Sequence, residues 1–299
     1  MLSTKTGSPI IVGEVLFDCF PDGAAVMGGA PFNVAWHLQG LGLSPLMVTS
    51  VGDDERGKTV LDAMGHWGMD TSGVLVNTAF PTGQVTVSLD NGQPEYTIEE
   101  NQAYDHIKLD QIRPQLANPR VPLLYHGSLL TRTSASRTML DNLIDYLKPA
   151  TFVDVNLRPP WWSMDDIKKS ISTATWLKLN DEELITVTQS AATDTQGLID
   201  CAQQLFEANQ LKTLIVTLGD KGAFCISAEG VVMGQPVKAS VIDTVGAGDS
   251  FSAVMITGLL QGWALDETLN RALHFAAAIC GIRGATTTDL SLYNNVLKQ

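Results

Sequence analysis

Long apolar runs are missing from this sequence of 299 residues, although 44% of its residues are hydrophobic. A helix that crosses a bilayer needs about 18 or more consecutive apolar residues, and no stretch reaches that length. The first nine residues are polar and lack the apolar segment of a secretory signal peptide. We therefore expect a cytoplasmic protein with enough apolar residues for a sizeable core.

Basic residues are also scarce, because 19 Lys and Arg stand against 32 Asp and Glu and the formal net charge is −13. Nucleic acids and anionic lipid surfaces need clustered positive charge, so neither is an expected partner. Small molecules are the expected partners. An anionic substrate would need a local patch of positive potential, formed by backbone N–H groups, a helix end, a few basic side chains or a metal ion.

Cysteine and histidine are few. The four cysteines are far apart and form no C-x-x-C pair, so we expect reduced thiols that pack as small hydrophobic groups. The five histidines show no metal-ligand spacing, and no Ser-His-Asp set is recognisable. Hydrolytic chemistry is therefore disfavoured.

Short β-branched runs alternate with helix-like stretches along most of the chain. Strands are predicted at residues 10–12, 46–51, 123–126, 151–155, 176–179 and 213–218, and helices near 32–41, 58–67 and 195–208 and after Ser134 and Met164. Such alternation is typical of a parallel sheet with helices on both faces. We predict a doubly wound, mainly parallel α/β body with no linker that would mark a domain boundary.

One segment breaks this rhythm. Apolar residues alternate with polar ones over residues 85–89 and again over 96–98. The sequence D-N-G at residues 90–92 is typical of a tight type I′ turn. The pattern predicts a β-hairpin with one solvent-exposed face. This hairpin is either decoration or part of a lid over a site.

The strongest candidate for phosphate chemistry is D-T-V-G-A-G-D-S-F at residues 243–251, which an apolar helix-forming run follows. Gly246, Ala247 and Gly248 allow backbone N–H groups to converge at a helix N-terminus, where they stabilise charge on a transferred phosphoryl group. Asp249 is badly placed to bind phosphate but well placed to accept a proton from an attacking hydroxyl. An ordinary helix start with a capping Asp has the same pattern.

A second candidate is G-D-D-E-R-G-K-T at residues 52–59, which fits the phosphate-loop pattern G-x-x-x-x-G-K-[ST] between a predicted strand and a predicted helix. Asp53, Asp54 and Glu55 would place three carboxylates in the loop that must cradle a triphosphate. We therefore interpret this segment as an ordinary strand-to-helix loop with acidic residues at a helix start.

A third candidate lies near the N-terminus, where Gly28, Gly29 and Asn33 follow Asp18. Glycines allow close approach of a ligand, and Asp18 and Asn33 offer acceptors and donors that suit adjacent hydroxyl groups of a neutral polyol. A turn at residues 22–23 and an Asn at a helix start explain the same residues, and the residues alone favour that reading.

Taken together, Gly28, Gly29 and Asn33 with the segment 243–251 resemble the two signature regions of the ribokinase-like (pfkB) carbohydrate kinases. The resemblance covers nearly the whole chain, and V-G-E-V-L-F-D at residues 12–18 is most similar to the fructokinase branch. It implies one domain, residues 1–299, with a small β lid formed near residues 14–30 and 80–102.

The resemblance also implies roles for the residues of both signatures. Asp249 would be the catalytic base, and residues 246–248 the anion hole. The implied sugar-binding residues are Asp18, Gly28, Gly29 and Asn33. N-D-E-E at residues 180–183 is similar to the family's N-x-x-E motif, in which Asn180 and Glu183 would organise Mg²⁺ and phosphate, largely through water. A helix N-cap explains the same residues and is compatible with that role.

Three other segments also resemble parts of the family. Thr217 and Gly219, with Lys221 next to them, resemble the family's nucleotide-contacting strand end, or form a plain strand-ending turn. D-V-N-L-R at residues 154–158 is similar to a segment of fructokinases and 2-keto-3-deoxygluconate kinases, in which Arg158 would reach a phosphate or substrate oxygen; a surface salt bridge is the alternative. Asp243 lies where relatives bind a monovalent cation, so potassium is an optional activator.

The chain departs from its relatives near the adenine, where Ala277 stands in place of an Asn or His. The implied activity is ATP- and Mg²⁺-dependent phosphorylation of a primary hydroxyl of a small sugar, with fructose expected. A 2-keto-3-deoxygluconate, ribose or nucleoside kinase and a non-catalytic sugar sensor remain alternatives.

A dinucleotide-binding dehydrogenase is disfavoured, because residues 246–248 lack the third Gly of G-x-G-x-x-G and lie far from the first strand. A homodimer formed through the lid is a further expectation from the family.

Overall fold

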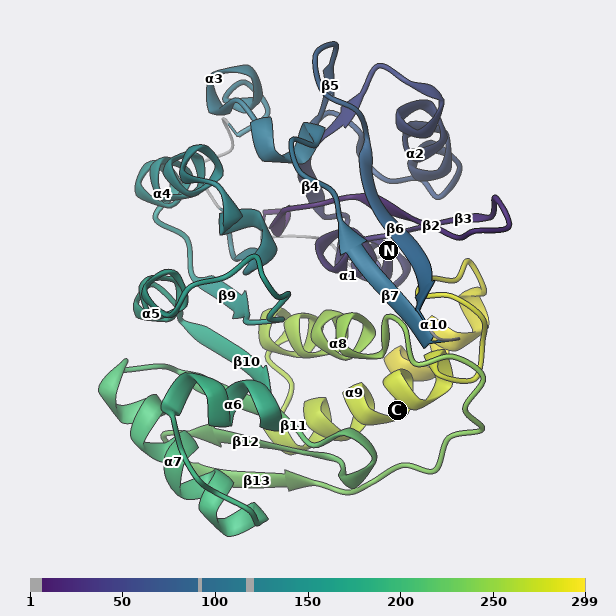
Figure 1. Ribbon diagram of the computed structural model, residues 1–299. Coiled ribbons are helices and arrows are strands. Elements are labelled where there is room, and N and C mark those ends of the chain that lie inside the picture. Colours follow the sequence, from purple (N-terminus) through teal and green to yellow (C-terminus); the bar gives the residue numbers. More distant parts are fainter. Residues whose placement is uncertain (1–6, 91–92, 117–120, 299) are drawn as a thin grey trace.

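The computed structural model describes residues 7–90, 93–116 and 121–298. A nine-stranded sheet runs through the molecule (Figure 1). Its strands, in spatial order, are β13 (Gly230–Gly234), β12 (Ala223–Ser227), β11 (Thr213–Thr217), β10 (Trp176–Asn180), β9 (Thr151–Asp154), β8 (Leu124–Gly127), β1 (Ile10–Val12), β4 (Leu46–Gly52) and β5 (Val74–Asn77). The strands from β11 to β5 are parallel, whereas β12 and β13 are antiparallel to their neighbours. The chain leaves β1 toward β4 and later returns on its other side to β8, so the strand order reverses beside β1.

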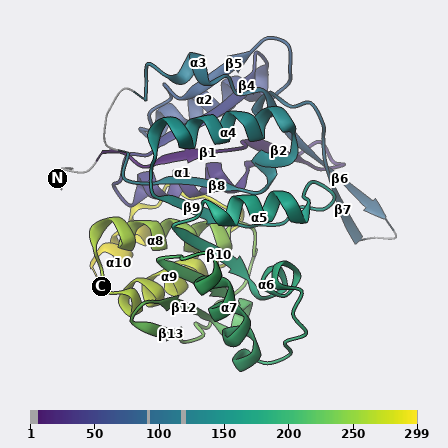
Figure 2. The same cartoon turned by 90° about the vertical axis from the view of Figure 1, so that its left-hand side faces the viewer.

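Helices cover both faces of this sheet (Figure 2). One face carries α1 (Ala30–Gly40), α2 (Glu55–His66), α8 (Ala247–Gln261), α9 (Leu265–Ile279) and α10 (Leu290–Lys298). The other carries α3 (Leu109–Ile112), α4 (Ser134–Leu147), α5 (Met164–Ser172), α6 (Asp181–Thr188) and α7 (Thr195–Ala208). Short 3₁₀ turns η1 (Ala103–His106), η2 (Leu129–Arg132) and η3 (Gly219–Lys221) complete the connections. In the described part of the chain, no helix is long and apolar enough to cross a bilayer.

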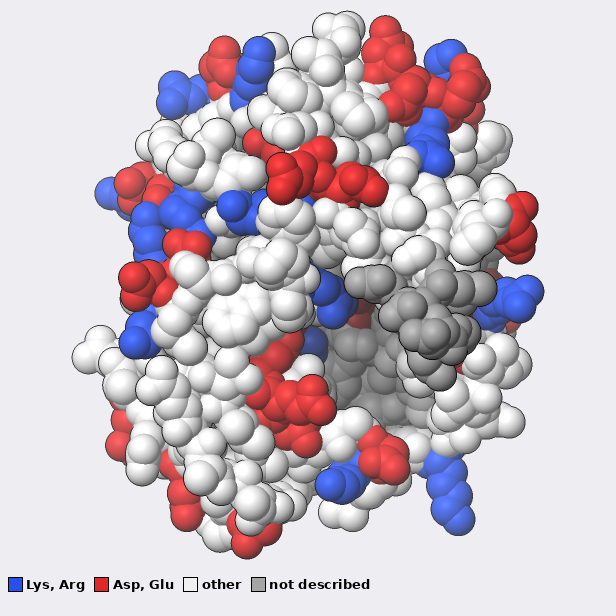
Figure 3. All heavy atoms as spheres, viewed as in Figure 1, with Lys and Arg blue, Asp and Glu red and all other residues white. Residues whose placement is uncertain are grey.

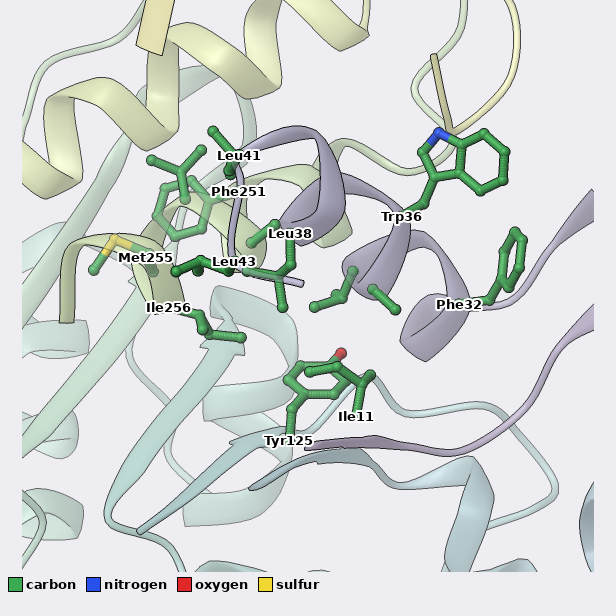
Figure 4. Packing of buried hydrophobic residues seen from close by; sticks show 14 of the residues in the cluster. Ile11, Phe32, Trp36, Leu38, Leu41, Leu43, Tyr125, Phe251, Met255 and Ile256 are labelled. Atoms are coloured by element: carbon green, nitrogen blue, oxygen red, sulfur yellow. The ribbon is translucent and has the colours of Figure 1, made fainter. Parts of the chain in front are cut away.

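Strand β1 shows why its residues form a doubly covered strand. Successive side chains of a strand point to opposite faces, so a strand covered on both sides is apolar throughout. Ile11 lies beside Tyr125 of β8 (Figure 4), in the buried cluster that also contains Phe32 of α1 and Phe251 of α8. Ile10 and Val12 belong to the cluster on the α4 face. Each such side chain contributes about 1.5–3 kcal/mol when fully buried.

A second, four-stranded sheet stands beside the main one. It has the order β3 (Ala25–Gly28), β2 (Leu16–Cys19), β6 (Gly83–Asp90) and β7 (Gln93–Ile98). All four strands come from the segments predicted as lid elements, near residues 14–30 and 80–102; whether this small sheet acts as a lid stays a prediction.

The predicted hairpin is confirmed, because β6 and β7 pair antiparallel from Val85–Ile98 to Asp90–Gln93. Val85 and Val87 are buried whereas Thr86 is half-buried and Ser88 is exposed, as expected of a hairpin with one solvent-exposed face. Tyr96, which pairs with Val87 on the same face, is 56% exposed. Its turn at residues 91–92 lies outside the described residues.

The predicted fold class is confirmed. All six predicted strands are present with ends that differ by at most one residue, and the predicted helices correspond to α1, α2, α4, α5 and α7. The predicted helix near residues 58–67 starts too late, because α2 begins at Glu55 behind its N-cap Asp54.

Candidate active site

A cavity of about 900 Å³ lies where the carboxyl ends of the parallel strands face the small sheet. The face shown in Figure 3 is hollowed near its centre, and Lys or Arg atoms show beside the hollow despite the acidic surface. Most predicted site residues line the cavity: Asp18, Gly29, Asn33, Arg158, Asn180, Glu183, Thr217, Asp243, Gly246, Gly248 and Asp249. Gly28, Gly219, Lys221 and Ala247 are not among its lining residues, and their roles stay predictions.

The first turn of α8 forms one wall of this cavity. Gly246 has φ 80°, and a Cβ there would lie 2.4 Å from the Cβ of Ala285, so glycine is required. The first helical bond runs from Ser250 N to Gly246 O, 2.8 Å. The amides of Gly248 and Asp249 precede it and belong to the donors that a helix leaves without an internal partner. This turn therefore has the geometry of an anion-binding site.

Asp249 connects the two predicted signature regions. Its Oδ2 accepts a hydrogen bond from Asn33 Nδ2 at 2.8 Å, across 216 residues of sequence. Burial is the main cause that raises the pKa of Asp249 to about 6; the Asn33 bond lowers it, Asp154 raises it, and Lys178 and Arg158 lower it. A carboxylate with this pKa is ionised at neutral pH and is a stronger base than an exposed Asp.

The start of α1 brings Asn33 to the same cavity. Gly29 precedes the helix with φ 111°, and a Cβ there would lie 2.8 Å from the carbonyl oxygen of Glu14. Asn33 is 3% exposed, and its Oδ1 has no partner among the described residues. Asp18 lines the cavity from β2, and burial raises its pKa while Arg158 lowers it. These acceptors suit the hydroxyl groups of a polyol.

The N-cap interpretation of Asn180 is confirmed. Asn180 Oδ1 accepts from Glu183 N at 2.8 Å, and Glu183 Oε2 accepts from Asn180 N at 2.9 Å, which is a capping box at the start of α6. Glu183 Oε1 also accepts from Leu157 N at 2.8 Å. Both oxygens are thus held by backbone amides, and the predicted part of Glu183 in organising Mg²⁺ stays a prediction.

Asp243 holds two cavity loops together. Its Oδ1 accepts from Val245 N and its Oδ2 from Gly284 N, both at 3.0 Å. The carboxylate therefore fixes the backbone beside the start of α8. Its predicted part in binding a monovalent cation stays a prediction.

The discounted phosphate-loop pattern at residues 52–59 is an ordinary helix start. Asp54 is the N-cap of α2 and accepts from Gly57 N at 2.8 Å and from Thr82 Oγ1 at 2.7 Å. Lys58 pairs with Glu55 on the surface, and no residue of the segment lines the cavity.

We expect Lys58→Ala to leave kcat and the KM for ATP unchanged within error, because Lys58 lies outside the cavity. In a true phosphate loop this Lys reaches the β- and γ-phosphates. Steady-state kinetics with varied ATP check this expectation. A tenfold rise in the KM for ATP would mean that residues 52–59 are a phosphate-binding loop after all.

Several charged residues of the cavity were not among the predicted site residues, and they include Glu14 and Lys178, which are buried. Glu14 is 3% exposed, its Oε2 has no partner among the described residues, and burial is the main cause that raises its pKa to about 7. Lys178 is buried on β10. A carboxylate just after the first strand and a Lys inside an apolar strand were the signals available.

Comparison with known proteins decides the family. Residues 21–291 match the model of the pfkB family carbohydrate kinases. The chain belongs to this family. It is 30% identical to Fructokinase-2 of Oryza sativa subsp. japonica, in an alignment that covers 90% of this chain and 85% of that protein. This pfkB protein is therefore an enzyme that phosphorylates a sugar.

Solved structures of pfkB-like kinases share its fold. A fructokinase with bound ATP from Xylella fastidiosa has a TM-score of 0.85 and 21% identity, over 97% of this chain and 98% of that one. A 2-dehydro-3-deoxygluconokinase from Thermotoga maritima also has a TM-score of 0.85, at 16% identity, over 98% of this chain and 100% of that one. The fold is thus equally close to kinases of two different substrates.

Proposed function

We propose that this pfkB kinase transfers the γ-phosphoryl group of ATP to a primary hydroxyl of a small sugar, with fructose as the preferred acceptor and Asp249 as the base. The observation that carries the proposal is the 2.8 Å hydrogen bond from Asn33 to Asp249. It joins a polyol-type subsite to a carboxylate at the start of α8, so an acceptor hydroxyl bound near Asn33 lies beside its base.

The sugar half of the cavity is formed by the small sheet and the start of α1. Leu16, Asp18 and Val26 line it from β2 and β3, and Val85 and Tyr96 from β6 and β7. A sugar bound there would lie beneath the small sheet, which acts as a lid. Closure of such a lid excludes water that would otherwise accept the phosphoryl group.

The nucleotide half is formed by the strand ends β10 and β11 and the start of α8. Asn180, Thr217 and Gly248 line this side, and the amides of the α8 turn suit the transferred phosphoryl group. The ATP-bound Xylella relative supports ATP as donor. When bound, Mg²⁺ would neutralise charge on the phosphates, and Glu183 would help to hold its water shell.

The chain's own residues then perform two tasks. Asp249, ionised at neutral pH, accepts the proton of the acceptor hydroxyl as it attacks the phosphorus. The α8 amides stabilise the charge on the phosphoryl oxygens. Positioning and charge stabilisation account for most of the rate in phosphoryl transfer, so a buried site with fixed donors suits the reaction.

Fructose is favoured over the alternatives because the relative at 30% identity is a fructokinase. Arg158 lines the cavity and would suit the carboxylate of 2-keto-3-deoxygluconate, so this acid is the second candidate. A sensor without activity is disfavoured, since a pure binding protein has no need of a base beside the anion-binding turn.

The test is ADP release by the purified protein with Mg²⁺ and ATP, measured on fructose, ribose, 2-keto-3-deoxygluconate, tagatose and adenosine, each with and without potassium. We expect the highest kcat/KM on fructose. A preference for 2-keto-3-deoxygluconate would make this acid the substrate, and Arg158 would then bind its carboxylate. Tight sugar binding by calorimetry without ADP release from any acceptor would contradict the proposed activity.

A further inference from the structure

A buried ion pair lies in the sheet beneath the first turns of α8. Asp154 and Lys178 are register partners on β9 and β10, and Lys178 Nζ lies 2.9 Å from both carboxylate oxygens of Asp154. The side chains are only 1% and 8% exposed, although both residues contribute to the cavity wall. The pair therefore forms the floor of the site next to Asp249.

This ion pair is bonded to α8. Ser252 Oγ donates to Asp154 Oδ2 at 2.9 Å and lies 3.0 Å from the carbonyl oxygen of Gly248. The position that a Cβ would take on Gly248 is 3.5 Å from Lys178 Nζ. The pair thus contacts, from the side of the sheet, the helical turn that carries Asp249.

Stability does not explain such a pair. Desolvation of two charges offsets most of their attraction, and apolar residues of similar volume often stabilise a core as well or better. On the same face of the sheet, the neighbouring positions Phe152 and Ile215 are apolar and fully buried. Two charges in this layer are therefore better explained by their effect on the site.

The positive charge of Lys178 follows from its surroundings. Burial alone would lower the pKa of the Lys178 ammonium, but Asp154 and Glu183 outweigh burial and the pKa is raised. Lys178 is therefore a cation at neutral pH, and it lowers the pKa of Asp249 while Asp154 raises it. The charged, titratable and hydrogen-bonding groups around these three residues are Glu14 after β1, Asn33 on α1, Tyr125 on β8, Arg158 after β9 and Glu183 on α6.

We propose that Lys178 and Asp154 are positioning residues for the base: they support the first turns of α8 and their opposite charges set the pH range in which Asp249 can accept a proton. This inference rests on the proposed role of Asp249. Neither residue needs to touch the sugar, because both act through Asp249 and the turn that carries it.

The test is the pH dependence of kcat/KM, whose acid limb reports the protonation of the base. Wild type should lose activity as the pH falls through about 6, because protonated Asp249 cannot accept a proton. Lys178→Met removes the positive charge that lowers the pKa of Asp249 and should move this limb up by about one pH unit. Asp154→Asn removes the negative charge that raises the pKa of Asp249 and should move the limb down by a similar amount.

Shifts in opposite directions distinguish an effect on the pKa of Asp249 from a distortion of the site. A distorted site would lose kcat at every pH, but the acid limb of its pH profile would stay in place. The exposed pair Lys169 and Asp141, between α5 and α4, provides matched controls. Lys169→Met and Asp141→Asn should leave the limb in place. Ser252→Ala keeps both charges and removes one bond to the turn, so it should lower kcat without moving the limb.

The outcomes are distinguishable from a failure of the proposed function. If Asp249→Asn is inactive but the charge variants keep the wild-type limb, the inference about the pair is wrong and the base stands. If Asp249→Asn keeps its turnover, the base itself is wrong. Where one charge variant does not fold, the direction shown by the other decides. If neither folds, unchanged kcat in Ser252→Ala overturns the proposal.

Discussion

An Asp249→Asn enzyme should bind its sugar and ATP but turn over about 10²- to 10⁴-fold more slowly, which is the contribution typical of one general base. The amide cannot accept the proton of the attacking hydroxyl. The anion-binding amides of the α8 turn are backbone groups and stay in place, so residual activity from positioning should remain.

The variant should fold, because its local contacts survive the substitution. The side-chain amide oxygen that Asp249→Asn introduces can still accept the hydrogen bond from Asn33 Nδ2, which lies 2.8 Å from Asp249 Oδ2 in the wild-type protein. The change also removes a partly buried carboxylate whose pKa burial has raised, so its effect on the free energy of unfolding should be small.

The measurement combines steady-state ADP release with sugar calorimetry on the same preparation. Asp62→Asn is the matched control, because it makes the same chemical change on the exposed side of α2, away from the cavity. We expect the control to keep kcat and the variant to keep its sugar affinity within a few-fold. Wild-type turnover in Asp249→Asn would remove Asp249 from the mechanism.

Local sequence signals predicted six of the nine strands of the main sheet and the start of α8. The parallel strands are short, apolar and β-branched because they are covered on both faces, and that pattern is visible without knowing their neighbours. A positive φ and the close contact with Ala285 require glycine at position 246, so the residue type alone indicates the turn. The resemblance supplied the grouping of the small sheet.

Long-range pairing could not be predicted in the same way. The Asn33–Asp249 bond and the Lys178–Asp154 pair depend on which strands are neighbours, and residues 154 and 178 look like isolated charges until β9 and β10 lie side by side. The antiparallel β12 and β13 were not among the predicted strands. They come after the alternating pattern ends and join the sheet as a hairpin at its edge.

The largest effect on stability should follow from Arg132→Met. Arg132 lies in η2, and its guanidinium donates from Nε and Nη2 to the two oxygens of Asp105 at 2.8 and 2.6 Å. The side chains of this pair are only 1% and 2% exposed. Arg132 Nη2 also donates to the carbonyl oxygen of Glu99, directly after β7, at 2.7 Å. One side chain thus ties the end of the small sheet to the main body.

Removal of this cation leaves the Asp105 carboxylate buried without its charge partner, which costs about 3–5 kcal/mol in the free energy of unfolding. The guanidinium also stacks over the rings of Tyr104 and Trp161, at 5.0 and 4.9 Å. Arg132→Lys should lose less, because it keeps the charge but not the two-pronged contact. Urea unfolding of the three proteins checks the order.

Arg113→Met is the control for that experiment, since Arg113 also lies over an aromatic ring, that of Tyr146 at 5.3 Å, but is exposed on the surface. It should cost less than about 1 kcal/mol, as exposed charged contacts do. A similar small loss in Arg132→Met would mean that water reaches Asp105 once the guanidinium is gone. The small sheet would then be held by its apolar contacts, and Arg132 would matter for its orientation over the cavity instead of for folding.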